Sequence, residues 1–365
     1  MLPLVVPKAV AVRSSVPRRA VRRVPLGLSD KGRFVFVVCI ALLIAMVISH
    51  AVAIWIKLPK GRAVYRRIGL ESGPQVFCAG SSLLQFGLSW PEVSEQLGQG
   101  IESWGEAGST PSEWEVFQSF PKNTDLMIIG VDLYDLNEHH LCDARADVVP
   151  IMQTIEDLWH SGADWQFAKR SLSQYPLSWL RKLFPTAGRS DDVIVRLRRK
   201  LPRQLRLSSA VDEEANSLVV PRQAVMNFGE SPLRVSDWPK SKTLRRLASM
   251  RNETRGRHAF NGPKKLAFQR MLLRAQQLGR VIVVVLPVAP VYRDELVTPE
   301  VLRDFQDTLV EAQQVCPQAQ LVRLDQLPAL NSNDYHTDLV HLNGAGRRIA
   351  TEAFVNWLRQ SSTKP

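Results

Sequence analysis

An uninterrupted apolar run from Phe34 to Ile56 constrains this chain most, because its 23 residues include no Asp, Glu, Lys or Arg. A helix of that length rises about 35 Å, which is enough to cross a hydrocarbon core of about 30 Å. A cleaved signal peptide usually has an apolar region of only about 7–15 residues and ends at small residues, whereas this run has Trp55 near its far end. A buried core helix is the alternative, but such helices rarely lack every charge over this length. We therefore expect a membrane-spanning helix over residues 34–56.

Basic residues before the apolar run predict its orientation. Residues 1–33 hold eight of the 47 Lys and Arg residues and one of the 35 acids, so this tail carries +7 of the formal charge of +12. Fewer bases follow the run, between Lys57 and Arg67. The positive-inside rule predicts a cytoplasmic tail at 1–33 and an extracytoplasmic domain at 57–365, which is periplasmic in a Gram-negative cell. His50, near the end of the run, is expected at the membrane interface.

The rest of the chain has the composition of a folded domain that needs no polyanionic partner. Only +5 of the formal charge remains outside the tail, and apolar and charged residues make up 45% and 22% of the chain, close to globular averages. No recognised nucleic-acid-binding motif is present. We expect a sizeable buried core and no binding to nucleic acid.

Three continuous apolar runs, at residues 75–79, 125–131 and 281–286, predict buried strands. Helical patterns lie between them, one beginning at Trp90-Pro91 and one at 264–278. Strands that are apolar on both faces and alternate with helices are typical of a parallel sheet covered on both sides. We predict an α/β fold, a three-layer sandwich with a central parallel sheet of the flavodoxin-like type, preceded by one transmembrane helix.

Residues from 143 to about 260 fit this alternation less well and are predicted to be an insertion. Five aromatic residues lie between helical stretches there, and a basic segment follows at 196–206. That segment is either a solvated helix face or a surface for an anionic glycan or lipid headgroups. The aromatic residues are Trp159, Trp165, Phe167, Tyr175 and Trp179.

Cysteine and histidine spacing predicts no metal site. Two cysteines lie in the apolar run and in the first predicted strand, which leaves Cys142 and Cys316 as the only plausible disulfide in an oxidising compartment. No CxxC spacing exists. His139 and His140 are adjacent, point in different directions and have no evident third ligand, so we expect them in a loop.

Polar residues near the ends of the predicted strands form a candidate hydrolytic site. Ser82 follows the first strand, at the edge where open α/β sheets place their sites. Asp338 precedes His341 by three residues, so its carboxylate can hold one ring nitrogen while the other faces a hydroxyl. Simpler roles are a helix cap for Ser82 and a surface position for His341. Together, and in this order, the three residues predict a Ser/His/Asp hydrolase on a parallel sheet.

With these motifs the sequence resembles the SGNH hydrolase superfamily, the GDSL-type lipases and esterases, and within it the membrane-anchored members linked to O-acylation of cell-surface polysaccharides. The resemblance covers roughly residues 74–136 and 280–358. It implies that Ser82 is the nucleophile, with Gly87 at a glycine that often follows. It implies an oxyanion-hole N–H from the second block at 105–109, at Gly108. Asp338 and His341 match the last block, whereas the nearby pair Asp334 and His336 has the wrong spacing.

The family's third block is where this sequence departs from the pattern. The family usually has Gly-x-Asn-Asp, whose asparagine donates to the oxyanion, and this chain has Asp132 in that place, within residues 130–135. An ionised aspartate has no proton to give, and losing one donor typically costs about 10²–10³ in rate. The oxyanion would then rely on the backbone N–H groups of Ser82 and Gly108. Asn137 is an alternative donor from a different register.

The resemblance implies a membrane-anchored serine acyltransferase or esterase that acts on O-acyl groups, such as acetyl, of a cell-surface or exported polysaccharide. Ser82 attacks, His341 moves the proton and Asp338 orients the ring, and neither an organic cofactor nor a metal is needed. Expected partners are the carbohydrate polymer or acyl ester and membrane proteins for polysaccharide export or acyl donation. Arg293, after the third predicted strand, is a candidate substrate contact. The alternative is a catalytically silent SGNH-fold subunit that binds glycan or scaffolds an envelope export complex.

Overall fold

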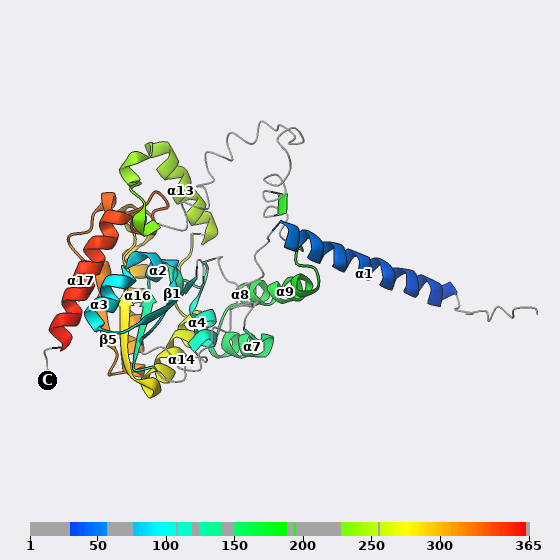
Figure 1. Cartoon of the computed structure of the whole chain (residues 1–365), viewed down its shortest axis with the longest axis horizontal. Coiled ribbons are helices and arrows are strands. Elements are labelled where there is room, and N and C mark those ends of the chain that lie inside the picture. The colour runs from blue at the N-terminus through cyan, green and yellow to red at the C-terminus, as the bar shows by residue number, and fades with distance from the viewer. Residues whose placement is uncertain are drawn as a thin grey trace, which may run out of the picture. The chain divides into compact units, whose positions relative to one another are not determined.

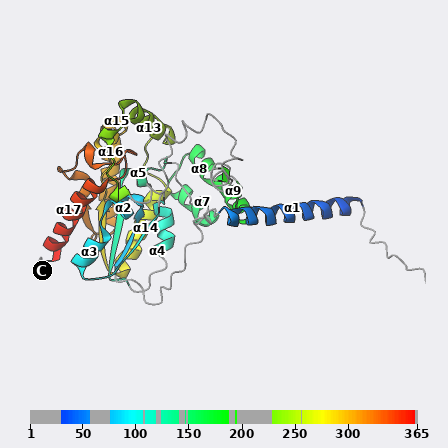
Figure 2. The ribbon, with the colours of Figure 1, turned by 45° about the horizontal axis from the view of Figure 1, so that its top comes forward.

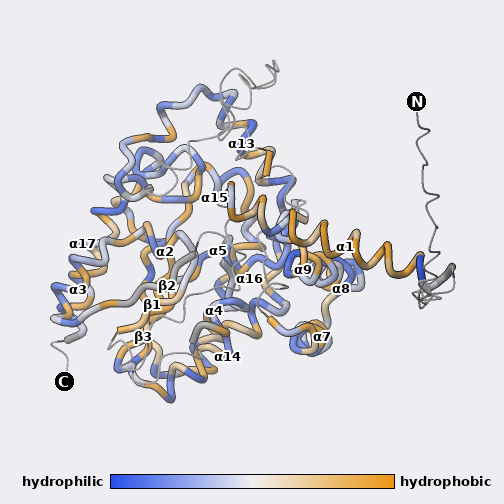
Figure 3. Tube along the Cα trace, turned by 45° about the vertical axis from the view of Figure 1, so that its right-hand side comes forward, coloured by the Kyte–Doolittle hydropathy of each residue, from blue (hydrophilic) through white to orange (hydrophobic). Residues whose placement is uncertain are grey.

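The computed structural model describes residues 30–56, 76–106, 109–118, 124–140, 146, 149–187, 193–194, 228–254 and 256–362. The chain divides into two units, residues 1–48 and 49–365. The first contains most of helix α1, Asp30–Trp55, which is coloured hydrophobic over most of its length in Figure 3. Its side chains at 34–48 are all apolar and nearly all exposed. Residues 32–55 of α1 are long and apolar enough to cross a membrane. The predicted apolar helix is therefore present, and its orientation stays a prediction.

The second unit is built on a β-sheet (Figure 1). The sheet has five strands in the order β2-β1-β3-β4-β5, and all neighbouring strands are parallel. The three predicted strands are confirmed as β1, β3 and β4. The sequence pattern missed β2 and β5, which lie at the two edges, because edge strands need no continuous apolar run. The strands are β1 Val76–Ser81, β2 Ile101–Glu106, β3 Leu126–Val131, β4 Arg280–Val285 and β5 Gln320–Arg323.

Helices connect successive strands, as parallel pairing requires. Helix α17 contacts both α2 and α3, and α14 contacts both α4 and α16; Figure 2 shows α3 beside α17 and α4 beside α14. The apolar core lies between these helices and the sheet, where β1, β3 and β4 are buried on both faces. The bounds are α2 Ser82–Gly87, α3 Trp90–Leu97, α4 Pro111–Gln118, α5 Leu133–Leu136, α14 Pro263–Leu278, α15 Pro290–Leu296, α16 Pro299–Val315, η5 Leu324–Gln326, η6 Ser332–Asp334 and α17 Gly344–Ser362.

The described residues between α5 and α14 are helical or irregular, within the segment that the sequence predicts to be an insertion. Helices α7, α8 and α9 contact one another in series, and α13 contacts α15. The basic segment at 196–206 lies outside the described residues. The elements are α7 Ile151–His160, α8 Trp165–Leu172, α9 Gln174–Leu183, η3 Phe228–Glu230, η4 Val235–Asp237 and α13 Lys240–Glu253.

Two glycines let α2 approach the sheet closely. A Cβ atom on Gly80 would lie 2.7 Å from the Cβ of Leu84, and one on Gly130 would also lie 2.7 Å from it. Neither strand can carry a side chain at these points without moving Leu84. The absence of both side chains therefore fixes the height of α2 above β1 and β3, and with it the position of Ser82 at the first residue of the helix.

Candidate active site

The carboxyl ends of β1 and β3 lie side by side at the point where the strand order of the sheet reverses. β2 lies on one side of β1, and β3 and β4 follow on the other, so the chain leaves these neighbouring ends toward opposite edges. Open α/β sheets bind their ligands at such a switch point. Ser82 follows β1 here and Asp132 follows β3.

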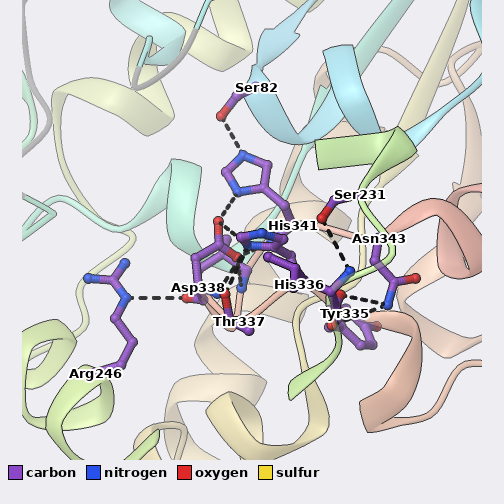
Figure 4. A network of polar contacts seen from close by, with 11 residues as sticks. Ser82, Ser231, Arg246, Tyr335, His336, Thr337, Asp338, His341 and Asn343 are labelled. Atoms are coloured by element: carbon purple, nitrogen blue, oxygen red, sulfur yellow. Dashed lines mark hydrogen bonds and ion pairs between the residues drawn. The ribbon is translucent and has the colours of Figure 1, made fainter. Parts of the chain in front are cut away.

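Ser82, His341 and Asp338 form a continuous hydrogen-bonded series at this edge (Figure 4). The Oγ of Ser82 lies 2.8 Å from Nε2 of His341, and Nδ1 of His341 lies 2.6 Å from Oδ2 of Asp338. The carboxylate accepts the Nδ1 proton, which leaves Nε2 free to accept from the hydroxyl. Side chains that lie 259 residues apart in the sequence are thus joined in the geometry that a nucleophilic serine needs.

Helix capping at this turn is performed by Ser81 rather than by Ser82. The Oγ of Ser81 accepts the backbone N–H of Leu83 at 3.1 Å and donates to Oδ2 of Asp135 at 2.9 Å. Ser81 is the N-cap residue of α2, where serine is strongly preferred. The simpler role considered for Ser82 therefore belongs to its neighbour, and the hydroxyl of Ser82 faces the imidazole.

A tight turn presents Asp338 and His341 to each other. Leu339 between them has a φ of 68°, an unusual left-handed conformation for a residue other than glycine, and its side chain is fully buried. Oδ1 of Asp338 accepts the N–H groups of Val340 and His341, each at 3.0 Å. The guanidinium of Arg246 on α13 donates to the Asp338 carbonyl at 3.3 Å.

Asn343 ties this turn to the start of α17. Its Oδ1 accepts the backbone N–H groups of Ala345 and Gly346, and its Nδ2 donates to the carbonyl of Asn333 at 2.7 Å. The same side chain therefore caps the last helix and holds the turn that carries Asp338 and His341.

The electrostatics of Asp338 fit a permanently ionised orienting group. Burial raises its pKa, but the charge of His341 and hydrogen bonds with His336 and His341 outweigh burial and hold the pKa well below its ordinary value. The carboxylate is therefore ionised at any pH at which the imidazole acts as a base.

The competing pair Asp334 and His336 is not arranged as a pair. Asp334 accepts the backbone N–H of Asn331 and caps the short helix η6. His336 is buried, its Nδ1 lies 3.8 Å from Asp338, and its backbone N–H donates to the His341 carbonyl. Both residues support the turn that carries His341.

Asp132 is fully buried at the end of β3, and one of its oxygens is unpaired. Oδ1 accepts the backbone N–H of Asp135 at 2.5 Å, whereas Oδ2 has no hydrogen-bond partner among the described residues. Burial raises the pKa of Asp132 to about 7, although hydrogen bonds and the charge of His341 act against it. Burial and the nearby Asp132 carboxyl also raise the pKa of Asp135 well above its ordinary value. The expectation that Asp132 has no proton to give therefore applies only to its ionised form, and the raised pKa favours the protonated form.

The two other candidate oxyanion donors are Gly108 and Asn137. Gly108 lies outside the described residues, while Ser109 beside it donates from Oγ to the carbonyl of Gly80 at 3.2 Å. The side-chain amide of Asn137 is engaged away from Ser82: Nδ2 donates to Arg257, and Oδ1 accepts N–H groups of His139 and Ala259. Asn137 is therefore not placed to act as the alternative donor.

Arg293 lies on α15, which follows β4 at the same edge of the sheet as Ser82. Its guanidinium is half exposed and pairs with Asp294 at 3.5 Å, and within the described residues no hydrogen bond or ion pair joins it to the Ser82 series. A substrate contact by Arg293 stays a prediction. Gly87 is the last residue of α2.

Cys142 lies outside the described residues, so its pairing with Cys316 stays a prediction; Cys316 is buried. His140 is buried against the ring of Tyr134, and burial followed by the charges of Lys264 and Arg246 lowers its pKa to about 2. In the described part of the chain, no three His, Cys, Asp or Glu residues are grouped to hold a metal ion.

Sequence reasoning missed three supports of the site, namely the Ser81–Asp135 bond, Arg246 and Asn343. An asparagine directly before the glycine that opens a predicted helix is a capping signal, so Asn343 could have been found. Arg246 lies 92 residues from Asp338 and carries no local signal.

Two comparisons with known proteins identify no relative of this chain. A scan against protein-family models finds no match to the chain, and a search of curated proteins finds none either.

Proposed function

We propose that this protein is a membrane-anchored serine esterase or O-acyltransferase with an SGNH-like three-layer fold. The observation that carries the proposal is the hydrogen-bonded series from Ser82 through His341 to Asp338 at the switch point of a parallel sheet. The strand order, which is that of flavodoxin-like sheets, supports the fold assignment. The resemblance of the sequence motifs supports the family.

In the proposed reaction, Ser82 Oγ attacks the acyl carbonyl carbon while His341 Nε2 takes the hydroxyl proton. The carbonyl π electrons move onto oxygen and then return, which breaks the ester C–O bond, and His341 gives its proton to the departing alkoxide. The acyl group remains on Ser82. A water molecule or a sugar hydroxyl then attacks, again with His341 as base, and releases Ser82 as the free hydroxyl.

We assign Asp132 to the oxyanion hole as a neutral carboxylic acid. Its unpaired Oδ2 is buried at the strand end next to that of Ser82, and a protonated carboxyl donates one O–H. Together with the backbone N–H of Ser82, and of Gly108 as the resemblance implies, this donor replaces the amide of the family's asparagine. The departure in the third block is then a change of donor rather than a loss of catalysis.

The substrate class and location rest on the resemblance and on the tail charge. An extracytoplasmic domain tethered by α1 reaches acyl esters of a cell-surface or exported polysaccharide, with export or acyl-donor membrane proteins as partners and with the N-terminus in the cytoplasm. No organic cofactor is required for the steps above.

Covalent labelling tests the enzyme function directly. We expect the full-length protein to react with a fluorophosphonate at Ser82, identified by mass spectrometry of the labelled peptide, because such probes require an activated serine. A Ser361→Ala variant, changed in the last turn of α17, is the matched control and should label normally. If Ser82 stays unlabelled in protein that retains its fold, the catalytically silent glycan-binding or scaffold subunit is the correct function.

The pH profile of Asp132 variants tests the oxyanion assignment. Since the raised pKa of Asp132 is about 7, wild-type kcat/KM should fall as that carboxyl ionises, whereas Asp132→Asn keeps its donor at every pH. We expect the ratio of Asp132→Asn to wild-type activity to rise by at least about tenfold between pH 6 and 9, and Asp132→Ala to lose about 10²-fold at pH 6. A ratio that stays constant over this range contradicts the assignment.

Stability provides a second readout for the same carboxyl. A buried Asp with a raised pKa binds more protons folded than unfolded, so wild-type stability should fall relative to Asp132→Asn as pH rises from about 4 to about 7. Urea unfolding of both proteins across that window measures the difference.

A further inference from the structure

Helices α7, α8 and α9 present a set of large apolar side chains to the outside. Trp159 is 84% exposed, Trp165 74% and Met152 69%. Scattered single apolar residues are normal on a protein surface, but a concentration within one 33-residue segment is not. This apolar face consists of Met152, Ile155, Trp159, Trp165, Trp179, Leu180 and Leu183.

The apolar residues of α7 lie on one side of the helix, and that side faces away from the protein. Met152, Ile155 and Trp159 are spaced by three and four residues, which places them on a common face. Thr154 and Asp157 are buried on the opposite face, and the buried Leu158 lies beside the stripe. An amphipathic helix on a soluble protein normally turns its apolar stripe toward the core, so α7 is oriented for an apolar environment outside the protein.

Helix α9 repeats this orientation. Leu180 and Leu183 are exposed, and the polar-tipped Tyr175 and Ser178 are the residues that it buries. The last turns of α8 and α9 carry basic side chains beside the apolar face, as amphipathic helices at a membrane surface do. They are Lys169, Arg170, Arg181 and Lys182.

The chain just after α9 is hydrogen-bonded to Ser49, near the end of α1. The hydroxyls of Ser49 and Thr186 lie 2.8 Å apart, and Thr186 also donates its backbone N–H to Ser49. Ser49 lies seven residues before the end of the apolar run at Ile56, which is about 10 Å along the helix axis. A segment bonded to Ser49 therefore lies level with the outer part of the span and not in bulk water.

We propose that the apolar face of α7, α8 and α9 inserts into the outer interfacial layer of the same membrane that α1 crosses. Tryptophan is the side chain most typical of this layer, and the exposed Lys169 and Lys182 meet lipid phosphates from its water side. The inference rests on the proposed membrane anchoring by α1 and is independent of the chemistry at Ser82. It adds a second membrane attachment and holds the catalytic unit close to the bilayer surface.

Depth-dependent quenching tests this attachment in the full-length protein. Single cysteines at Trp159, Leu180, Ile44 in α1 and Val310 on α16 are labelled with an environment-sensitive fluorophore in a Cys39→Ser, Cys142→Ser background, because Cys78 and Cys316 are buried. Each labelled protein is placed in vesicles of phosphatidylethanolamine and phosphatidylglycerol, with nitroxide lipids as one quencher and iodide as the other. Val310 is 52% exposed and far from the apolar face in sequence, so it is the matched surface control.

We expect lipid nitroxides to quench the labels at 159 and 180 at least about twofold more strongly than the label at 310, and iodide to quench them less. If the label at 44 is quenched by lipid while those at 159 and 180 behave like 310, the interfacial attachment is wrong although the anchor stands. If the label at 44 is not quenched, the anchor itself fails. Labels at 159 and 180 that are shielded from both quenchers indicate a protein partner on this face and overturn the proposal. A label at Ile155 repeats the test without loss of a tryptophan.

Discussion

Replacing Ser82 with alanine is expected to abolish acyl-ester turnover, with a fall in kcat of at least about 10³-fold and up to about 10⁶-fold. The hydroxyl 2.8 Å from Nε2 of His341 is the only group in the series able to form the acyl-enzyme. Alanine removes it and leaves only binding and any oxyanion donors. Hydrolysis of an acetyl ester by the full-length protein, together with acetylation of the polymer in cells, measures the loss.

The neighbouring serine provides a sharp contrast for this experiment. Ser81→Ala removes the cap of α2 and should cost about 1 kcal/mol of stability while Ser82 still reacts with a fluorophosphonate. Two adjacent serines thereby separate a structural role from a chemical one. A Ser82→Ala protein that keeps both its circular dichroism spectrum and its activity would refute the assignment of the nucleophile.

Asp338→Asn is expected to lower kcat by about 10⁴-fold with little change in the fold, equivalent to about 5.5 kcal/mol in the barrier. The asparagine oxygen can still accept the N–H groups of Val340 and His341, which turns its amide toward Nδ1. An NH₂ group there forces Nδ1 to be the acceptor and puts the ring proton on Nε2. A protonated Nε2 cannot accept the hydroxyl proton of Ser82. Single-turnover kinetics of the ester would show the loss in the acylation step.

Asp334→Asn is the matched control, because asparagine can still accept the Asn331 N–H that Asp334 caps. We expect its activity to stay close to that of the wild type. If Asp334→Asn proves as damaging as Asp338→Asn, then the competing pair of Asp334 and His336 carries the chemistry.

Unfolding measurements check the electrostatic part of this prediction. The pKa of Asp338 is lowered in the folded protein, so its ionised form stabilises the fold above the unfolded pKa of about 3.9. That contribution is lost as pH falls toward the folded value. The stability advantage of wild type over Asp338→Asn should therefore be full at pH 6 and shrink as pH drops below about 4.

The sequence alone determined those features that depend on local composition or on short spacings. A charge-free run of 23 residues predicts a long apolar helix, which is α1. The continuous apolar runs of β1, β3 and β4 require burial on both faces of the sheet. The three-residue separation of Asp338 and His341 brings their side chains together within one turn. These features need no distant contact to be read.

Tertiary structure decided everything that depends on long-range packing. It placed the Ser82 hydroxyl on His341 rather than on the helix cap, buried Asp132 deeply enough to raise its pKa, and turned the apolar stripe of α7 outward. Residue type specifies what a side chain can do, but burial and partners from remote segments set its charge and direction. The charge and the orientation of a side chain depend on how strands and helices distant in sequence pack, so only the folded chain determines them.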